Sequence, residues 1–338
     1  MGLDRDTDSD SFACRIAQDA YRNGKDMRTL TVVCITLLSS ACHRQMAEDH
    51  SSHMSSTESA RSSGRAGAEL PASNGASAAR VAASPRRGEW VKVPFEPGSK
   101  DTIMAWVVYP SSARAKAPVV VVVHDIGGLS VWARGVADQL AAEGFIGVTP
   151  DMTSRLRGTP SSVELPRDSA GKLMGMVNSG ERNRIISAVA KYAMSRPNAE
   201  QRYGVVGYCW GGGTAFMHSV NGGTTGFSGA VAFYGLPYMD GPRLIGDSLA
   251  KIKVPMMLFN GSKDARIGSA IPALDSAMKQ LGKTFRSTNY DGATHGFMRS
   301  QDDPKATRDL AEEAANLTAT KDAWPRTVEF MKRNLGVR

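Results

Sequence analysis

The sequence predicts an α/β protein with a mostly parallel, doubly wound sheet that has helices on both faces. Runs of Val, Ile and Phe alternate with helical patterns from Gly88 to the end of the chain. Val119–Val123 is apolar at every position, which is typical of a central strand in a parallel sheet. A strand-like run also meets Gly207–Gly211 and then a helical pattern, which indicates a strand, a sharp turn and a helix in succession.

The elements are expected in the following order. Two edge strands at 89–95 and 103–110 flank a Pro-Gly turn, and the central strand 119–123 leads into a glycine-bearing loop. Residues 152–179 show little periodicity, which predicts a long excursion over the sheet. The other expected elements are helices at 131–143, 181–196 and 271–281, strands at 145–149, 203–206, 227–234, 254–259 and 284–290, and two closing helices near 304–317 and 322–335.

Composition separates residues 1–87 from the rest of the chain. This part is rich in Ser, Ala, Asp and Arg, and it predicts a leader followed by a flexible tether. Residues 88–338 then form one globular domain.

The leader contains a candidate export signal at 27–42. A short positive start, the apolar run Leu30–Leu38 and small residues before Cys42 match the parts of a secretory signal peptide, with Met27 as an alternative start of the chain. Cys42 also resembles a bacterial lipoprotein attachment site, although Ser39 stands where that site prefers leucine. We expect export, as a periplasmic protein or one with a lipid anchor at Cys42; a cytoplasmic protein is the alternative.

Charge and cysteine usage exclude several classes. The formal net charge of +8 favours anionic surfaces or substrates, but the chain has no basic run and no nucleic-acid motif, so we do not expect nucleic-acid binding. Three of the four cysteines lie in the leader, so the domain has Cys209 as its single thiol and cannot form an internal disulfide. No Cys/His cluster has the spacing of a metal site, and nothing in the sequence indicates a cofactor.

Three candidate catalytic residues follow three different strands. Cys209 lies at the apex of the strand-to-helix turn, where a side chain is exposed and a helix N-terminus favours a thiolate. Asp264 and His295 follow the strands at 254–259 and 284–290, and reactive groups collect at the carboxyl ends of such strands. The order nucleophile, acid and histidine is that of α/β hydrolases.

Each candidate also has a structural interpretation. Cys209 could be a small buried residue at an ordinary turn, Asp264 a turn or capping residue, and His295 a hydrogen-bonded loop histidine. The competing polar residues near strand ends or in the domain are interpreted as structural; they are His124, Asp151, His218 and Asp291.

The segment Gly207-Tyr208-Cys209-Trp210-Gly211-Gly212, with Gly261-x-x-Asp264 and His295-Gly296-Phe297, resembles the dienelactone hydrolase family over about 89–335. The resemblance implies an α/β-hydrolase fold and a triad of Cys209, His295 and Asp264 that cleaves small-molecule esters or lactones through an acyl-enzyme. It further implies that the backbone N–H groups of Trp210 and Ile126 bind the oxyanion.

The resemblance also implies roles for two charged residues. Many members carry glutamate where this chain has Asp125, a carboxylate that would gate ionisation of the thiol. Arg299 matches an arginine that holds a substrate carboxylate, and a salt-bridging surface arginine is the alternative. A second such arginine would come from Arg155, Arg157 or Arg167.

A second hypothesis from another class is a non-catalytic or thiol-redox-responsive binding protein on the same scaffold, with Cys209 as the sensor. The lack of a second cysteine in the domain argues against disulfide chemistry there.

Overall fold

The computed structural model describes residues 69–111, 116–236, 239–240, 243–244, 246–301 and 309–337. The candidate signal at 27–42 and the candidate lipid site Cys42 lie outside the described residues. No helix in the described part of the chain is both long and apolar enough to cross a membrane.

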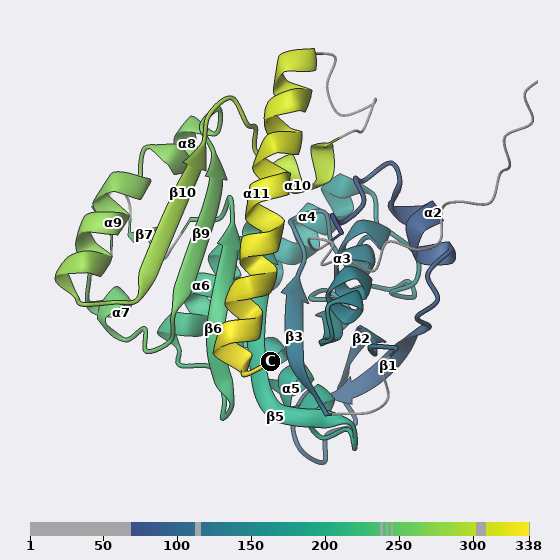
Figure 1. Cartoon of the computed structure of the whole chain (residues 1–338). Helices are drawn as coiled ribbons and strands as arrows, with labels where there is room; N and C mark the ends of the chain where they lie inside the picture. Colours follow the sequence, from purple (N-terminus) through teal and green to yellow (C-terminus); the bar gives the residue numbers. More distant parts are fainter. Residues whose placement is uncertain are drawn as a thin grey trace, which may run out of the picture. The chain divides into compact units, whose positions relative to one another are not determined.

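An eight-stranded sheet carries the fold, in the order β1-β2-β4-β3-β5-β6-β9-β10 (Figure 1). The strands are β1 Gly88–Pro94, β2 Thr102–Val108, β3 Ala117–Val123, β4 Ile146–Pro150, β5 Ala199–Tyr208, β6 Phe227–Phe233, β9 Met256–Gly261 and β10 Phe285–Tyr290. The β1–β2 and β2–β4 pairs are antiparallel, and the other pairs are parallel. A short separate hairpin pairs β7 (Met239–Asp240) with β8 (Arg243–Leu244).

The strand order reverses beside β3. After β3 the chain adds β4 on one side, and then returns to add β5 on the other. At such a switch point the loops after the two neighbouring strands diverge, which opens a crevice at the carboxyl ends of the strands. The loops after β3 and β5, which contain Asp125 and Cys209, meet at this place.

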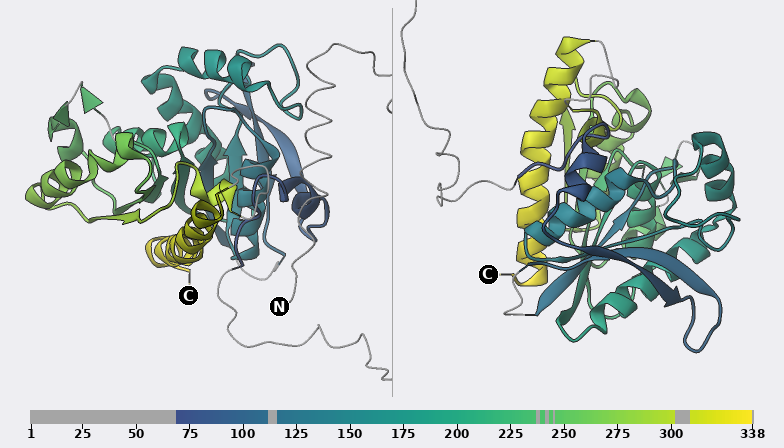
Figure 2. Two further views of the ribbon diagram at one scale, coloured as in Figure 1. Left: turned by 90° about the horizontal axis from the view of Figure 1, so that it is seen from above. Right: turned by 90° about the vertical axis from the view of Figure 1, so that its right-hand side faces the viewer.

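Helices cover both faces of the sheet, as Figure 2 shows. They are α2 Ser77–Ala82, α3 Val131–Ala142, α4 Arg167–Met176, α5 Ser179–Met194, α6 Trp210–Val220, α7 Gly246–Ala250, α8 Ala265–Gly268, α9 Ile271–Gln280, α10 Phe297–Ser300 and α11 Leu310–Leu335. Alternate residues of β3 point to opposite faces of the sheet. Val119, Val121 and Val123 pack in the core that contains residues of α5 and α6, whereas Val120 and Val122 pack with α3 and α11.

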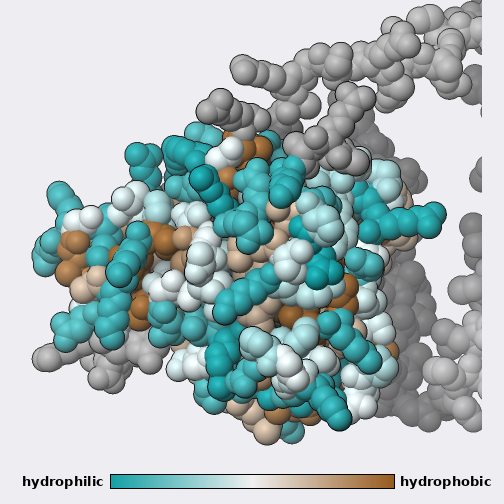
Figure 3. Space-filling model, turned by 90° about the horizontal axis from the view of Figure 1, so that it is seen from below, coloured by the Kyte–Doolittle hydropathy of each residue, from teal (hydrophilic) through white to brown (hydrophobic). Residues whose placement is uncertain are grey.

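The apolar sides of the helices are therefore turned onto the sheet. Figure 3 shows one face of the molecule from below: hydrophilic residues predominate there, and the apolar residues form small separate patches.

Two helical predictions need correction. The excursion predicted at 152–179 contains α4, whose apolar pattern is too weak to stand out in the sequence. The prediction of two closing helices is wrong, because the described residues form one 26-residue helix, α11, which continues through Pro325. Proline removes one N–H donor from a helix, but packing of Trp324 and Val328 on the core keeps the neighbouring turns in place.

Residues 69–87, here called the amino-terminal strap, pack on the domain, although composition placed them in the tether. Leu70 packs against the core that includes α3 and α11. The Trp132 indole N–H donates to Ala72 O over 3.0 Å, and Arg86 forms a 2.8 Å ion pair with the buried carboxylate of Asp138. The domain boundary predicted at residue 88 is thus too late. Residues 69–87 have little apolar pattern of their own, but contacts with α3 and with the core hold them on the domain.

Candidate active site

Cys209 lies at the sharp turn between β5 and α6. Its φ of 56° and ψ of −115° are unusual for a residue with a side chain. The flanking glycines make the turn possible: a Cβ on Gly207 would lie 2.0 Å from Gly211 O, and one on Gly211 would lie 2.2 Å from Val123 O. The backbone therefore approaches closely on both sides and holds the thiol at the apex.

His295 and Asp264 meet the thiol from two neighbouring loops. His295 Nδ1 and Asp264 Oδ2 are 2.5 Å apart, and the imidazole lies near enough to Cys209 to lower the pKa of its thiol. The loops that carry them touch, since a Cβ on Gly261 would lie 2.3 Å from Ala293 O. Asp264 precedes α8, but its side chain makes no capping bond and points to His295 instead. The structure thus brings the three candidates together in the predicted order.

The electrostatics favour a thiolate and an imidazolium. Burial raises the pKa of the Cys209 thiol, but the hydrogen bond and charge of His295, with the Trp210 N–H, outweigh burial and hold that pKa below its usual value. Burial lowers the pKa of His295, but its hydrogen bonds to Cys209 and Asp264 outweigh this effect and raise the pKa above its usual value. Each group therefore stabilises the charged form of the other.

A pocket of about 480 Å³ opens beside the thiol. Trp210, whose backbone N–H is directed to the sulfur, and Ile126, from the loop after β3, both line it. The remaining lining residues are Ser179, Arg182, Cys209, Gly213, Met217, Tyr234, Gly235, Leu236 and Arg266.

Among the lining residues that sequence reasoning missed, three have side chains that bear on the chemistry of the site: Arg182, Tyr234 and Arg266. Arg182 lies over the Trp210 ring, 4.2 Å from its centroid, and Arg266 follows Asp264 after two positions. The Tyr234 ring lies 5.0 Å from the His295 ring, and its φ of 36° is a second positive value near the site. The sequence offered one signal for these residues, which is the position of Arg266 two residues after Asp264. It offered none for Arg182, because packing decides which side of α5 faces the pocket.

Asp125 and Arg299 lie together at this site. The Arg299 guanidinium forms an ion pair with Asp125 Oδ2, and Asp125 Oδ1 accepts a 2.6 Å hydrogen bond from the Gly127 N–H. Both side chains are largely shielded, with 27% exposure for Arg299 and 9% for Asp125. The Asp125 charge acts to raise the pKa of the Cys209 thiol. Arg299 is thus held by Asp125 rather than projecting alone into the pocket.

The other candidate arginines differ in position. Arg155 pairs with Asp101 and Glu181, and Arg157 pairs with the buried carboxylate of Asp151 at 2.8 Å. Arg167 begins α4 and lies near the Asp125 loop, since a Cβ on Gly127 would be 3.9 Å from its Nη1. Arg167 is thus placed beside the loop that carries Asp125.

The histidines interpreted as structural are buried and hydrogen-bonded. His124 lies between Asp125 O and the Met152 N–H, and His218 contacts the Tyr203 hydroxyl at 2.9 Å. Burial lowers the pKa of both, so each is held as a neutral packing residue.

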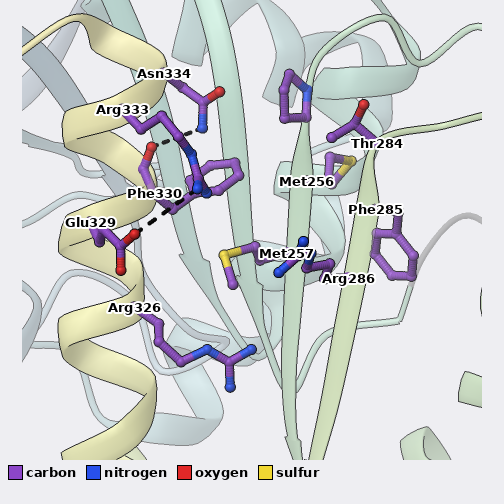
Figure 4. A pocket seen from close by; sticks show the side chains of 11 residues that line it. Met256, Met257, Thr284, Phe285, Arg286, Arg326, Glu329, Phe330, Arg333 and Asn334 are labelled. Atoms are coloured by element: carbon purple, nitrogen blue, oxygen red, sulfur yellow. Dashed lines mark hydrogen bonds and ion pairs between the residues drawn. The ribbon is translucent and has the colours of Figure 1, made fainter.

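A second pocket, of about 310 Å³, lies at the opposite ends of the strands (Figure 4). Met256 and Phe285, which begin β9 and β10, form one side, and Arg326 and Phe330 of α11 form the other. The Arg326 guanidinium forms an ion pair with the Asp322 carboxylate, with an N–O distance of 2.7 Å. No cysteine or histidine is among the described residues that line this pocket, so the Cys209 pocket is the candidate active site.

Comparisons with known proteins agree with this architecture. The model of the dienelactone hydrolase family matches residues 103–335. Carboxymethylenebutenolidase from Pseudomonas putida is 27% identical over 193 residues, which cover 56% of this chain and 79% of that protein. A crystal structure from Klebsiella pneumoniae superposes with a TM-score of 0.58 at 20% identity, covering 75% of this chain and 100% of the other. The crystal structure of a dienelactone hydrolase-like promiscuous phosphotriesterase from metagenomic libraries superposes with a TM-score of 0.55 at 18% identity. The superposition covers 71% of this chain and 98% of the other. The chain is therefore a hydrolase with the α/β-hydrolase fold and belongs to the dienelactone hydrolase family.

Proposed function

We propose that the protein hydrolyses carboxylic esters or lactones of small molecules with Cys209 as the nucleophile. The observation that carries the proposal is the thiol at the strained turn, which lines one pocket and whose pKa is lowered by an imidazole that is itself bound by a carboxylate. Nucleophile, base and orienting acid in this arrangement are what acyl transfer needs.

Acylation begins with the Cys209 thiolate. Its Sγ attacks the ester carbonyl carbon, forming a C–S bond while the carbonyl electron pair moves onto oxygen. The N–H groups of Trp210 and Ile126 stabilise that oxyanion. The tetrahedral intermediate collapses, the C–O bond to the leaving group breaks, and His295 Nε2–H protonates the leaving alkoxide. Asp264 holds the imidazole in the tautomer that presents Nε2 to the thiol.

Deacylation uses the same groups in reverse. His295 Nε2 takes a proton from water, the resulting hydroxide attacks the thioester carbonyl, and the thiolate leaves as the acid product forms. The imidazolium and the thiolate are then restored together, and the two steps consume only the ester and one water molecule.

The pocket favours a substrate with both apolar and anionic parts. Met217, Leu236 and Trp210 supply apolar surface, and Arg182 and Arg266 bring positive charge to the same cavity. The name of the Pseudomonas putida relative describes a lactone hydrolase. We therefore place small anionic esters and lactones first among the substrates.

Asp125 and Arg299 form a thiol-gating pair in this proposal. The carboxylate opposes formation of the thiolate, and the guanidinium balances part of that charge. Loss of this pairing would leave the Asp125 charge less balanced and would raise the pKa of the Cys209 thiol.

The test is turnover of a short-chain aryl ester and a small lactone by Cys209→Ala. Removal of the nucleophile should lower kcat by about 10³-fold or more, because no other step can replace the attack. Mass spectrometry of the wild type, quenched during turnover, should show the acyl group on Cys209. Wild-type kcat in Cys209→Ala, together with an unmodified thiol, would contradict the proposal.

A further inference from the structure

The amino-terminal strap contacts the segment that carries Arg299. The Asn74 N–H donates to Arg299 O over 2.9 Å, and Gln301 Nε2 donates to Pro71 O over 2.8 Å. Gln301 is 1% exposed, and its Nε2 also donates to Met298 O of α10. The strap is thus hydrogen-bonded to the last turn of α10 by one backbone and one buried side-chain contact.

The strap is fixed elsewhere by α3. Trp132 donates to Ala72 O, and its ring packs edge-on against Tyr208 at 4.8 Å, the residue before Cys209. The ion pair between Arg86 and Asp138 holds the far end of the strap on the same helix. The strap therefore joins α3, which packs behind the nucleophile, to α10, which follows His295.

The position of α10 bears directly on the thiol. Arg299 lies in this four-residue helix and pairs with Asp125, whose other oxygen is fixed by the Gly127 N–H. His295 and Asp125 are two charged groups that act on the Cys209 thiol in opposite directions, because His295 lowers its pKa and Asp125 raises it. A shift of α10 would loosen the pair and leave the Asp125 charge less balanced beside the sulfur.

We propose that the amino-terminal strap is a positioning element of the active site, which holds α10 so that Arg299 stays paired with Asp125 beside the Cys209 thiol. The strap lies before residue 103, where the match to the family begins. The inference rests on the proposed site but concerns the reactivity of its thiol, which is measured without a substrate.

Asn74 allows a test that changes one hydrogen bond. The Ala76 N–H bonds to Ser73 O, so Asn74 is the second residue of a turn, a position at which proline is well tolerated. Asn74→Pro removes the N–H that Arg299 O accepts. Asn74→Ala keeps that N–H and is the matched control, because the Asn74 side chain is exposed.

The readout is the rate at which iodoacetamide alkylates Cys209 in the full chain, followed at the Cys209 peptide by mass spectrometry across pH. Asn74→Pro should slow alkylation at neutral pH by about threefold, because an Asp125 charge that is less balanced raises the pKa of the Cys209 thiol. Asn74→Ala should match the wild type. In an Arg299→Ala background, Asn74→Pro should add no further slowing.

Two outcomes would overturn the proposal. If Asn74→Pro lowers the melting temperature by about 2–4 °C while alkylation is unchanged, the strap only stabilises the fold. If it slows alkylation equally with and without Arg299, the strap does not act through the Asp125–Arg299 pair. Neither outcome depends on whether Cys209→Ala abolishes hydrolysis, so the two proposals fail separately.

Discussion

At the scale of single residues, Cys209 and His295 shift each other's pKa in opposite directions. The pKa of Cys209 lies below its usual value, so the thiolate persists to lower pH than for a free thiol. The pKa of His295 lies above its usual value, so the imidazolium persists to higher pH than for a free histidine. The proposed acylation step needs both charged forms, because in it the thiolate attacks and the imidazolium protonates the leaving group.

This predicts a bell-shaped pH profile of kcat/KM for an aryl ester. The acid limb reports protonation of the thiolate, and the alkaline limb reports loss of the proton from the imidazolium. Asp264→Asn weakens the bond that favours the charged imidazole, so the alkaline limb should move to lower pH and kcat/KM should fall by about 10²–10⁴-fold.

The neighbouring turn offers a control for that prediction. Asp291 is exposed and accepts a 3.3 Å hydrogen bond from the Ser262 hydroxyl, so Asp291→Asn should leave both limbs in place. An alkaline limb at the same pH in Asp264→Asn and the wild type would show that Asp264 does not set the ionisation of His295.

At the scale of elements, close backbone contact between α6 and the loop after β3 sets the site. A Cβ on Gly211 would lie 2.2 Å from Val123 O and 2.6 Å from His124 O, and both are backbone atoms that no side-chain rotation can move. Helix α6 must therefore lie directly against the loop that carries Asp125 and Ile126.

Gly211→Ala should separate α6 from that loop. Overpacking of this kind costs about 1–3 kcal/mol, which lowers the melting temperature of a domain of this size by about 2–12 °C. Differential scanning calorimetry measures the shift. Gly175→Ala, in α4 with no atom near the added Cβ, should leave the melting temperature equal or slightly higher. An equal response of the two variants would refute the close-contact explanation.

At the scale of the whole molecule, we propose that the chain is exported before it acts. The positive start, apolar run and small residues of 27–42 motivate this proposal, and they lie outside the described residues. Because signal peptidases cut after such small residues, the mature protein in its host should begin at or near Cys42. N-terminal sequencing by mass spectrometry checks this, and a mature product that retains Leu30–Leu38 would contradict it.

Local pattern was sufficient for much of the fold. The fully apolar strand 119–123, the amphipathic helices that became α3, α5 and α9, and the turn at Cys209 were predicted from periodicity and glycine placement, because these signals act over a few residues. The convergence of Cys209, Asp264 and His295 followed from their places after three strands. Wrong predictions arose where distant packing decides: α11 runs through Pro325, and the strap is ordered by α3 and α10.

What the sequence by itself determined is thus the class of fold, the order of most elements and the places of Cys209, Asp264 and His295 after three strands. Tertiary structure alone decided that Arg299 pairs with Asp125, 174 positions away, that Arg182 enters the pocket from α5, and that residues 69–87 reach α10. The physical reason is that strand and helix patterns arise from neighbours along the chain. A pairing between distant charges instead depends on how packed helices and loops are placed in space, which no short stretch of sequence records.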